Sequence, residues 1–503
     1  MKKSVKKLLK AKPVTDFLGN PCILVDNELE CAFKQILFRQ ILHRTGFKKR
    51  SGDCLISVMY SLLIWPLLSV QSISNFCGRK LSCYMKGGEN VLYDFLKRED
   101  LNWRKLQYNT AKTIYLENGL KNEQIRAFVF DDTIKHRRGK RVEGSSWHFD
   151  HTEGRSVQGQ QVLEMGLVTP KGYLPIDSQI YVSASKAILK EDKFADSRSA
   201  VALDYADACD LNKNEMMRDM MKRSLRAGIV ANYVITDSWF GNKGNIYETK
   251  QLDLTGFFRM KCGTTNYRVN GRLLSDKALY VLLKKKARPI KGMPWKAFSI
   301  TVELNFEKES GIKDDWHEVL LVFTVPKDEY SGKYGLFLCT DTELTPQKVL
   351  EIYSLRWSIE VYFKEVKQHM GFLSEQTGNY ACHYASIHLS AIRYMVFSHI
   401  MMQDDSGKSL SNIRTEVATK IELLSYANIL WMVFRALIHG ALDSLIDSIG
   451  ELVVKIVKTT IDSTVLDFLE EALQIDKVSL DIETKANKKR NEINFYGDLA
   501  PVG

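Results

Sequence analysis

The chain has 503 residues, and its 71 lysine and arginine residues exceed its 60 aspartate and glutamate residues, which gives a formal net charge of +11. Hydrophobic residues at 45% and charged residues at 26% are typical of globular proteins, and these values exclude a mostly disordered or fibrous chain. The length predicts two to four domains around a substantial core. A pI near 9.0 favours an anionic partner, with nucleic acid first and an anionic membrane second.

The cysteine and histidine patterns predict neither a disulfide framework nor a structural metal site. The nine cysteines are odd in number and include no C-x-x-C pair. His148 and His151 flank Asp150, but no further ligands follow at metal-binding spacing, so we do not interpret them as a zinc site. This cysteine usage favours a reducing cytoplasm.

Three apolar stretches raise the question of a membrane span. Residues 54–70 are too few to cross a bilayer and contain Pro66, so we expect a buried helix pair broken near that proline. Arginines interrupt the other two stretches, 384–402 and 426–445. The basic N-terminus has no apolar run behind it and does not resemble a secretory signal. We therefore expect a soluble protein that has no membrane partner.

The first part of the chain, up to residue 120, is predicted to be helical. Its apolar residues recur at helical spacing, for example from Phe33 to Leu42 and from Val91 to Leu96. Six lysines and no acidic residue occur among the first twelve positions, as in a solvated basic arm or a phosphate contact.

The middle of the chain has a mixed strand and helix pattern. A short apolar run at 127–130 predicts a strand buried on both faces, and it leads directly into Asp131 and Asp132. A second such run at 233–236 leads into Asp237. The other predicted elements are a hairpin at 162–168 and 173–182, helices at 214–227 and 241–252, and a strand at 256–260. This order predicts an α/β fold in which two strands end at aspartates.

Residues 263–340 are predicted to be strand-rich, and they include a basic cluster around Lys284. A long helix is expected to begin at Thr345-Pro346, with threonine as its cap and proline in its first turn. Beyond Gly371 the chain is again predicted to be helical and apolar-rich, and it ends in a basic tail.

The long helix after Pro346 presents five polar residues at helical spacing. They are Tyr353, Arg356, Glu360, Lys364 and Lys367, which share one stripe. A solvated charged face is the ordinary interpretation of such a stripe. It does not explain why a tyrosine, an arginine and a glutamate lie beside the apolar stripe of the same helix.

Asp132, Asp237 and Glu360 form a candidate set of three carboxylates. Hard divalent cations such as Mg²⁺ prefer oxygen ligands of this kind. Two such ions can activate the attacking oxygen and stabilise the leaving oxygen of a phosphodiester. The basic residues of the helix stripe would then contact the phosphate backbone.

The helix pattern Y-x2-R-x3-E-x6-K, formed by Tyr353, Arg356, Glu360 and Lys367, resembles the signature of bacterial transposases of the insertion sequence 4 family. The resemblance covers residues 125–372. It implies a ribonuclease H-like catalytic core with a DDE triad, and a β-rich insertion between the last two acids.

Within this resemblance the triad is Asp132, Asp237 and Glu360, since the first aspartate of the family sits in a D-T pair like Asp132-Thr133. The triad would hold two Mg²⁺ or Mn²⁺ ions. The implied partners are double-stranded DNA with terminal inverted repeats, target DNA and a second copy of the chain in a synaptic complex. The activity would be cut-and-paste transposition through hairpin ends, in the bacterial cytoplasm at the nucleoid. The residues expected to contact DNA are Tyr353, Arg356, Lys364, Lys367, Trp357, Arg137 and Arg138.

The resemblance also implies a domain organisation. We expect a helical DNA-binding region at 1–120, the ribonuclease H-like core at 121–262 and 341–372, the β-rich insertion at 263–340, and a helical dimerisation region at 373–503.

Several alternatives stay open. Only one of Asp131 and Asp132 can face the metals, because successive strand residues point to opposite faces, and the D-T pattern favours Asp132. The aromatic residues Trp357, Trp239 and Phe240 would hold flipped bases in the family, but core packing explains them equally well. The chain could instead be a non-catalytic, sequence-specific DNA-binding protein descended from such an enzyme, or a repair or structure-specific nuclease on the same core.

Overall fold

The structure is a computed structural model that describes residues 27–68, 70–78, 84–150, 153–263, 265–326, 334–404 and 406–472. The chain divides into two compact units. We call the first the helical unit (Met1–Ile114, Lys193–Ala202 and Glu365–Pro501) and the second the sheet unit (Tyr115–Asp192, Leu203–Lys364 and Val502–Gly503). The N-terminal lysines, His151 and the basic tail lie outside the described residues. The domain boundaries expected from the sequence stay predictions.

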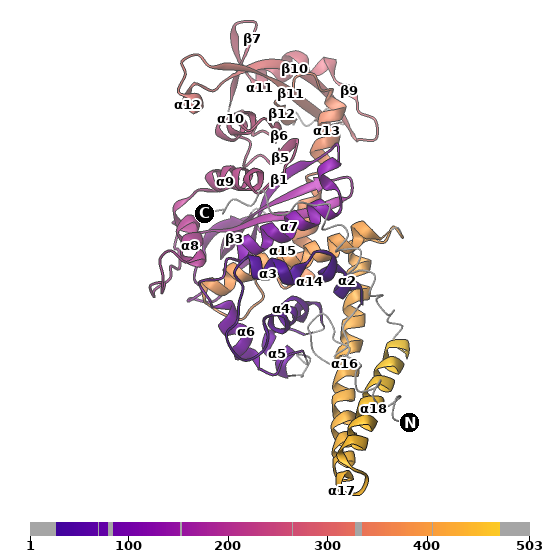
Figure 1. Cartoon of the computed structure of the whole chain (residues 1–503). Coiled ribbons are helices and arrows are strands. Elements are labelled where there is room, and N and C mark those ends of the chain that lie inside the picture. The colour runs from indigo at the N-terminus through magenta and orange to yellow at the C-terminus, as the bar shows by residue number, and fades with distance from the viewer. Residues whose placement is uncertain are drawn as a thin grey trace. The chain divides into compact units, whose positions relative to one another are not determined.

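One mixed sheet of twelve strands runs through the sheet unit (Figure 1). Its centre is parallel, because β5 (Tyr233–Thr236) pairs in parallel with both β1 (Ala127–His136) and β6 (Thr255–Arg259). The other strands pair antiparallel: β2 (Ser146–Asp150), β3 (Arg155–Thr169), β4 (Gly172–Tyr181), β7 (Asn266–Val269), β8 (Arg272–Ser275), β9 (Arg288–Pro289), β10 (Trp295–Asn305), β11 (Trp316–Pro326) and β12 (Gly335–Cys339).

The strand order is β2-β3-β1-β5-β6-β12-β11-β10-β7-β8, with β4 on the free edge of β3 and β9 beside β10. The predicted α/β class is confirmed, and the mixed sheet with its helices is consistent with a ribonuclease H-like core. The strand-rich segment after residue 263 continues the same sheet, because β12 pairs with β6. Its apolar side chains, such as Phe298, Leu321 and Phe323, form one buried cluster with α11 (Asp276–Leu283).

Two predicted elements of the sheet unit have different bounds in the structure. The strand expected at 127–130 continues to His136, because every residue of β1 pairs with a residue of the longer strand β3. The helix expected to run unbroken from Pro346 divides into α13 (Pro346–Ser354) and α14 (Trp357–His369). At the break the backbone hydrogen bonds join residues three apart, as in a 3-10 turn. One example is the bond from the Arg356 N–H to the Tyr353 carbonyl oxygen at 3.1 Å.

The remaining helices of the sheet unit lie between the strands in sequence. α9 (Lys213–Arg226) begins with a capping box in which Asn212 and Glu215 each bond the other's backbone, and it buries four methionines. The other helices are α8 (Ala200–Asp210), α10 (Lys243–Gln251), α12 (Glu307–Ser310) and the 3-10 turn η3 (Lys284–Lys286).

The helical unit is built around α15 (Tyr380–Gln403), whose residues are buried from Tyr380 to His399. Arg393 of α15 is fully buried, and its guanidinium donates to the carbonyl oxygens of Leu62, Leu63 and Met370. The other helices are α2 (Asn27–Gln35), α3 (Phe38–Arg44), α4 (Leu55–Ile64), η1 (Trp65–Leu67), α5 (Ile73–Gly78), α6 (Glu89–Leu96), α7 (Trp103–Glu117), α16 (Leu410–Asp443), α17 (Ile446–Ile449) and α18 (Glu451–Ala472). The 3-10 turn η2 (Leu120–Asn122) that follows α7 belongs to the sheet unit. The predicted break near Pro66 is a 3-10 turn rather than the start of a second helix.

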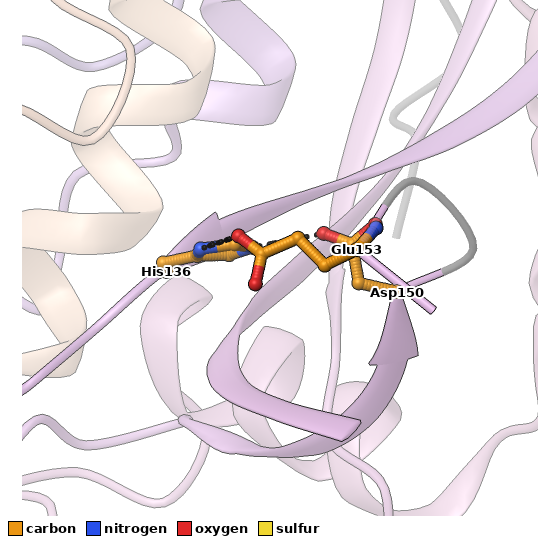
Figure 2. A group of neighbouring side chains, drawn as sticks. All are labelled: His136, Asp150 and Glu153. Carbon is orange, nitrogen blue, oxygen red and sulfur yellow. Dashed lines mark hydrogen bonds and ion pairs between the residues drawn. The ribbon is translucent and has the colours of Figure 1, made fainter. Parts of the chain in front are cut away.

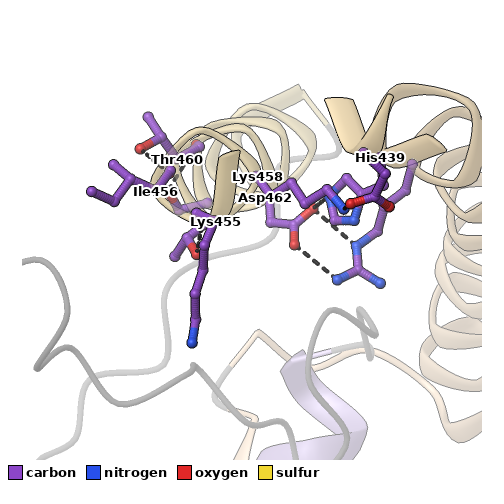
Figure 3. A network of polar contacts seen from close by, with 10 residues as sticks. His439, Lys455, Ile456, Lys458, Thr460 and Asp462 are labelled. Atoms are coloured by element: carbon purple, nitrogen blue, oxygen red, sulfur yellow. Dashed lines mark hydrogen bonds and ion pairs between the residues drawn. The ribbon is translucent and has the colours of Figure 1, made fainter. Parts of the chain in front are cut away.

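The helices α16 and α18 form a hairpin joined by α17. Asp462 of α18 accepts a bidentate pair of hydrogen bonds from Arg435 of α16 at 2.9 Å, and it lies 3.0 Å from His439 Nε2 (Figure 3). Among the described residues, α16 is the one helix long and apolar enough to cross a membrane by length and composition, and 28% of its most apolar window is buried.

Candidate active site

The register of the central strands decides which side of the sheet each acid faces. β1 and β5 are parallel with Val129 beside Ile235, so Asp131 and Asp237, each two residues further on, point to one face. Asp132 follows Asp131 and therefore points to the opposite face. We call these the α14 face, which carries Asp131, and the α9 face, which carries Asp132. Asp131 contacts Arg356, the residue just before α14, and Asp132 contacts Lys213 of α9.

On the α14 face, Arg356 connects the strand aspartate to the signature helix. Its Nη1 donates to Asp131 Oδ2 at 2.9 Å, and its Nη2 donates to Glu360 Oε1. Because Arg356 lies in the break between α13 and α14, its side chain reaches β1 while Glu360 follows one turn later on α14. The guanidinium thus holds two carboxylates from distant parts of the chain together.

Asp237 directly follows β5 and is held by the turn that begins there. Its Oδ1 accepts hydrogen bonds from the backbone N–H groups of Trp239 at 3.0 Å and Phe240 at 3.4 Å. Phe240 is buried, which fits core packing, whereas Trp239 is 47% exposed. The ammonium groups of Lys213 and Lys261 lie 4.1 and 4.9 Å from the centre of the Trp239 ring.

The electrostatics of the α14 face are those of crowded carboxylates. Burial raises the pKa of Asp131 to about 7; the Arg356 guanidinium opposes this rise, and the charges of Asp237 and Asp132 add to it. Burial also raises the pKa of Asp237; the Trp239 N–H and the Arg356 guanidinium oppose this rise, and the charge of Asp132 adds to it. Acids that resist ionisation next to one another are typical of sites that bind a cation.

On the α9 face, Asp132 has its own partners. Its Oδ2 accepts from Lys213 Nζ at 2.6 Å and its Oδ1 from Gln161 Nε2 at 2.7 Å. The Arg356 guanidinium joins Asp131 to Glu360, and its charge opposes the rise in the pKa of Asp237, whereas Asp132 pairs with Lys213.

The other residues expected to contact DNA differ in exposure. Tyr353 is half-buried with its ring 4.7 Å from that of Phe337, and burial raises the pKa of its hydroxyl to about 12. Trp357 is 65% exposed, and Lys364 is exposed as well. Lys367 is exposed on the part of α14 that belongs to the helical unit.

The loop after β1 contains the two predicted arginines. Arg137 donates to Gln160 Oε1 at 2.9 Å, and Arg138 is exposed. At the end of β1, His136 lies between two carboxylates, with Asp150 Oδ2 2.9 Å from Nε2 and Glu153 Oε1 3.4 Å from Nδ1 (Figure 2). These contacts join the end of β1 to the β2–β3 turn.

Lys213 is the functional candidate that sequence reasoning missed. It occupies the first position of α9, and its ammonium contacts both Asp132 and the Trp239 ring. The capping box Asn212–Glu215 is visible in the sequence and could have predicted the start of this helix one residue earlier. No sequence pattern indicates that the helix start lies beside β1.

The three acids of the α14 face fit a divalent metal ion. All three interact with the Arg356 guanidinium, so the site already holds one cationic group among its carboxylates. The donor atoms are all oxygens, which is the set that Mg²⁺ and Mn²⁺ prefer over softer metals.

Two protein-family models match the chain. The model described as "DDE superfamily endonuclease" matches residues 66–286, and the model described as "Transposase DDE domain" matches residues 194–395. These matches indicate a nuclease-type enzyme of the DDE class, and the fold is consistent with a ribonuclease H-like core. They support a DDE transposase family for this chain, and DDE nuclease domains generally use divalent metal ions.

Among solved structures, the NurA nuclease from Sulfolobus solfataricus is similar over 53% of this chain and 84% of its own, with 12% sequence identity and a TM-score of 0.23. No curated protein matches the chain.

Proposed function

We propose that the protein is a DNA transposase of the insertion sequence 4 type, which cuts the ends of its element and joins them to target DNA. The observation that carries this proposal is the pair of contacts by which Arg356 joins Asp131 to Glu360, on the face that also carries Asp237. Arg356 and Glu360 belong to the helix signature. Transposase and endonuclease family matches support the reaction class. Hairpin ends and integration follow from the resemblance of the signature.

The proposed metal-binding acids are Asp131, Asp237 and Glu360. Two bound Mg²⁺ or Mn²⁺ ions would supply activation of the attacking oxygen and stabilisation of the leaving oxygen. Asp132 remains the acid favoured by the D-T pattern, but we propose Asp131 for the first position because it shares a face with Asp237 and contacts Arg356.

The residues around the acids have distinct proposed roles. Arg356 orients Asp131 and Glu360 and balances their charge before DNA arrives. The exposed side chains of Lys364 and Arg138 are available to phosphates, and the exposed Trp357 ring is available to stack on a base. Tyr353 packs against Phe337. We propose that Tyr353, Lys367 and Arg137 also contact the DNA, the two basic residues at its phosphate backbone.

The proposed partners are double-stranded DNA with terminal inverted repeats, target DNA and a second copy of this chain. The α16–α18 hairpin supports a homodimer, because it exposes apolar side chains such as Leu430, Phe434, Leu437 and Phe468. We propose that the copies meet through this hairpin in the synaptic complex, and that the protein acts in the bacterial cytoplasm at the nucleoid.

The test is cleavage of a DNA fragment that carries the sequences flanking the gene, incubated with the purified chain and Mg²⁺. We expect strand cleavage at inverted repeats, loss of cleavage when EDTA removes the metal, and loss in Glu360→Gln. Unchanged cleavage in Glu360→Gln would exclude the assigned site. Tight binding of the ends without any cleavage would identify a non-catalytic DNA-binding protein, and cleavage without regard to the repeats would identify a structure-specific nuclease.

A further inference from the structure

A buried carboxyl group lies on the α14 face beside the proposed active site. Glu164 of β3 stands opposite Asp131 of β1 and opposite Ser178 of β4, so the three side chains point to the same face. Glu164 has no exposed surface. The residue is thus the immediate cross-strand neighbour of a proposed metal-binding acid, without itself reaching solvent.

Aromatic rings of α14 and β4 pack against each other on the same face of the sheet. Gly166, two residues beyond Glu164, lies under the Tyr173 ring, and a Cβ at this position would lie 2.2 Å from a ring carbon. The ring of Tyr173 lies 5.2 Å from that of Tyr362 on α14. Because Gly166 has no side chain, the Tyr173 ring of β4 can lie across β3 at this position. The Tyr362 ring of α14 then packs against the Tyr173 ring.

The chemistry of Glu164 is unusual for a packed interior. Burial raises its pKa well above the usual range, while the hydroxyl groups of Ser178 and Tyr362 oppose the rise. Neither of its oxygens forms a hydrogen bond of standard geometry with the described residues. An apolar side chain would be more stable here, since a buried polar group without good hydrogen bonds carries a desolvation penalty. A carboxyl group at such a position is therefore a candidate for function.

The contacts of α14 with the sheet lie on both sides of Glu360. The Arg356 guanidinium, just before α14, joins the helix to β1, and Tyr362 packs against the Tyr173 ring of β4, which lies over Gly166 of β3. A helix that contacts a sheet at one point can rotate about that contact. A second contact fixes both the distance of the helix from the sheet and its rotation. Glu360 lies between the two contacts, so its position depends on both.

We propose that Glu164 is a positioning residue of the nuclease site, which through Tyr362 sets where α14 lies on the sheet and so holds Glu360 at the distance from Asp131 and Asp237 that metal binding requires. This inference rests on the proposed function. Glu164 acts through Tyr362 and contacts neither DNA nor metal itself.

A packing role and a positioning role predict different behaviour. If Glu164 only fills space, Glu164→Leu keeps the metal requirement of the enzyme and changes thermal stability alone. If it positions α14, Glu164→Leu keeps or raises the unfolding temperature but raises the Mg²⁺ concentration needed for half-maximal cleavage. Groups that orient metal ligands typically change metal affinity or activity by about 10- to 100-fold when removed.

The experiment measures cleavage of the flanking-sequence DNA by the full chain across a range of Mg²⁺ concentrations. We expect the half-maximal Mg²⁺ concentration to rise about tenfold or more in Glu164→Leu and to shift in the same direction in Tyr362→Phe, which removes only the hydroxyl. Glu164→Gln should stay within about threefold, because an amide keeps polar atoms at the same place. DNA binding in EDTA should not change in any of these variants.

The matched control is Met165→Leu, because Met165 is the next residue of β3, is equally buried and points to the α9 face. It should leave the Mg²⁺ requirement unchanged. If the wild type is active and neither Glu164→Leu nor Tyr362→Phe needs more Mg²⁺ than the wild type, the positioning role is overturned but the proposed function is not. If Glu164→Leu does not fold, the Mg²⁺ requirement of Tyr362→Phe decides the question. A wild type that cleaves no DNA overturns the proposed function, and the inference falls with it.

Discussion

Asp131 and Asp132 are consecutive residues of β1, yet the Asp131 carboxylate forms an ion pair with Arg356 and the Asp132 carboxylate forms one with Lys213, on opposite faces of the sheet. The alternation of side chains along a strand produces this separation. One aspartate therefore belongs to the group of acids around the signature helix. The other joins β1 to the start of α9.

This separation predicts different effects of two isosteric substitutions. Asp131→Asn should lower the cleavage rate at least about a hundredfold, because it removes a charge from the proposed metal-binding set. Asp132→Asn should lower it less than about tenfold, because its carboxylate contacts Lys213 and Gln161 instead. Single-turnover cleavage of the flanking-sequence DNA measures both rates. If Asp132→Asn were the more damaging change, the D-T pattern would assign the triad correctly and Asp131 would have a supporting role.

Asp131→Asn should also change stability with pH in the absence of metal. The pKa of Asp131 is raised to about 7 in the folded chain, from 3.8 for an ordinary aspartate. A raised carboxyl pKa means that ionisation opposes folding, so stability is lost as pH rises from about 4 to about 7. We expect Asp131→Asn to unfold at higher urea concentration than wild type at pH 8, in EDTA, and to show no such advantage at pH 4. An equal or lower midpoint at pH 8 would contradict the pKa direction.

The sequence predicted that buried strands occur at 127–130 and 233–236 and that the signature lies in a helical region, because continuous apolar runs and helical spacing are local patterns. It did not predict that β1 continues through both aspartates to His136 or that the helix breaks at Arg356. The choice between Asp131 and Asp132 could not be made in this way. It depends on the register of β1 with β5, which lies about a hundred residues away in the chain. The contact of Lys213 with Asp132 depends likewise on where α9 packs, which no local pattern records.

Lys213 and Asp132 should be energetically coupled. Lys213→Met leaves the Asp132 carboxylate, which is 20% exposed, with Gln161 as its hydrogen-bond donor, and we expect a loss of about 2 kcal/mol in the free energy of unfolding. The double variant Lys213→Met/Asp132→Asn should recover part of this loss, because no charge is then left without its partner. A double-mutant cycle by urea denaturation should give a coupling of about 1–3 kcal/mol. Additive losses would show that the ion pair contributes nothing.

His148 should make the chain less stable in mild acid. Burial lowers the pKa of His148 to about 4, the Lys213 charge lowers it further, and Asp132 opposes this. The unfolded chain, with an ordinary histidine pKa near 6.5, binds the proton more readily, so stability falls as pH drops through 6.5 toward 4. Between pH 7 and pH 5 the loss should be about 2 kcal/mol.

The variant His148→Gln tests this pH dependence, since an amide can keep the hydrogen bond to Ser146 Oγ, 2.8 Å from the histidine Nε2. Urea midpoints at pH 7 and pH 5 should differ less in the variant than in wild type. A residual difference is expected from His399, a buried histidine of the helical unit whose pKa is also lowered to about 4. The same pH dependence in both chains would show that His148 does not titrate in this range.

The α16–α18 hairpin should depend on Asp462. This carboxylate accepts from both Arg435 and His439, so Asp462→Ala removes the shared partner of two side chains at once (Figure 3). We expect the hairpin to open locally, with about 1–2 kcal/mol less protection of its amide hydrogens, while the sheet unit keeps its exchange rates. Hydrogen exchange of the full chain measures both regions together.

The matched control is Asp443→Ala, because Asp443 joins the same two helices through Lys458 at 2.5 Å but is 54% exposed. An exposed pair of this kind is worth less than about 1 kcal/mol, so the control should leave the hairpin protected. Equal loss in the two variants would mean that the charge count of the hairpin, rather than the bidentate contact at Asp462, holds the two helices together.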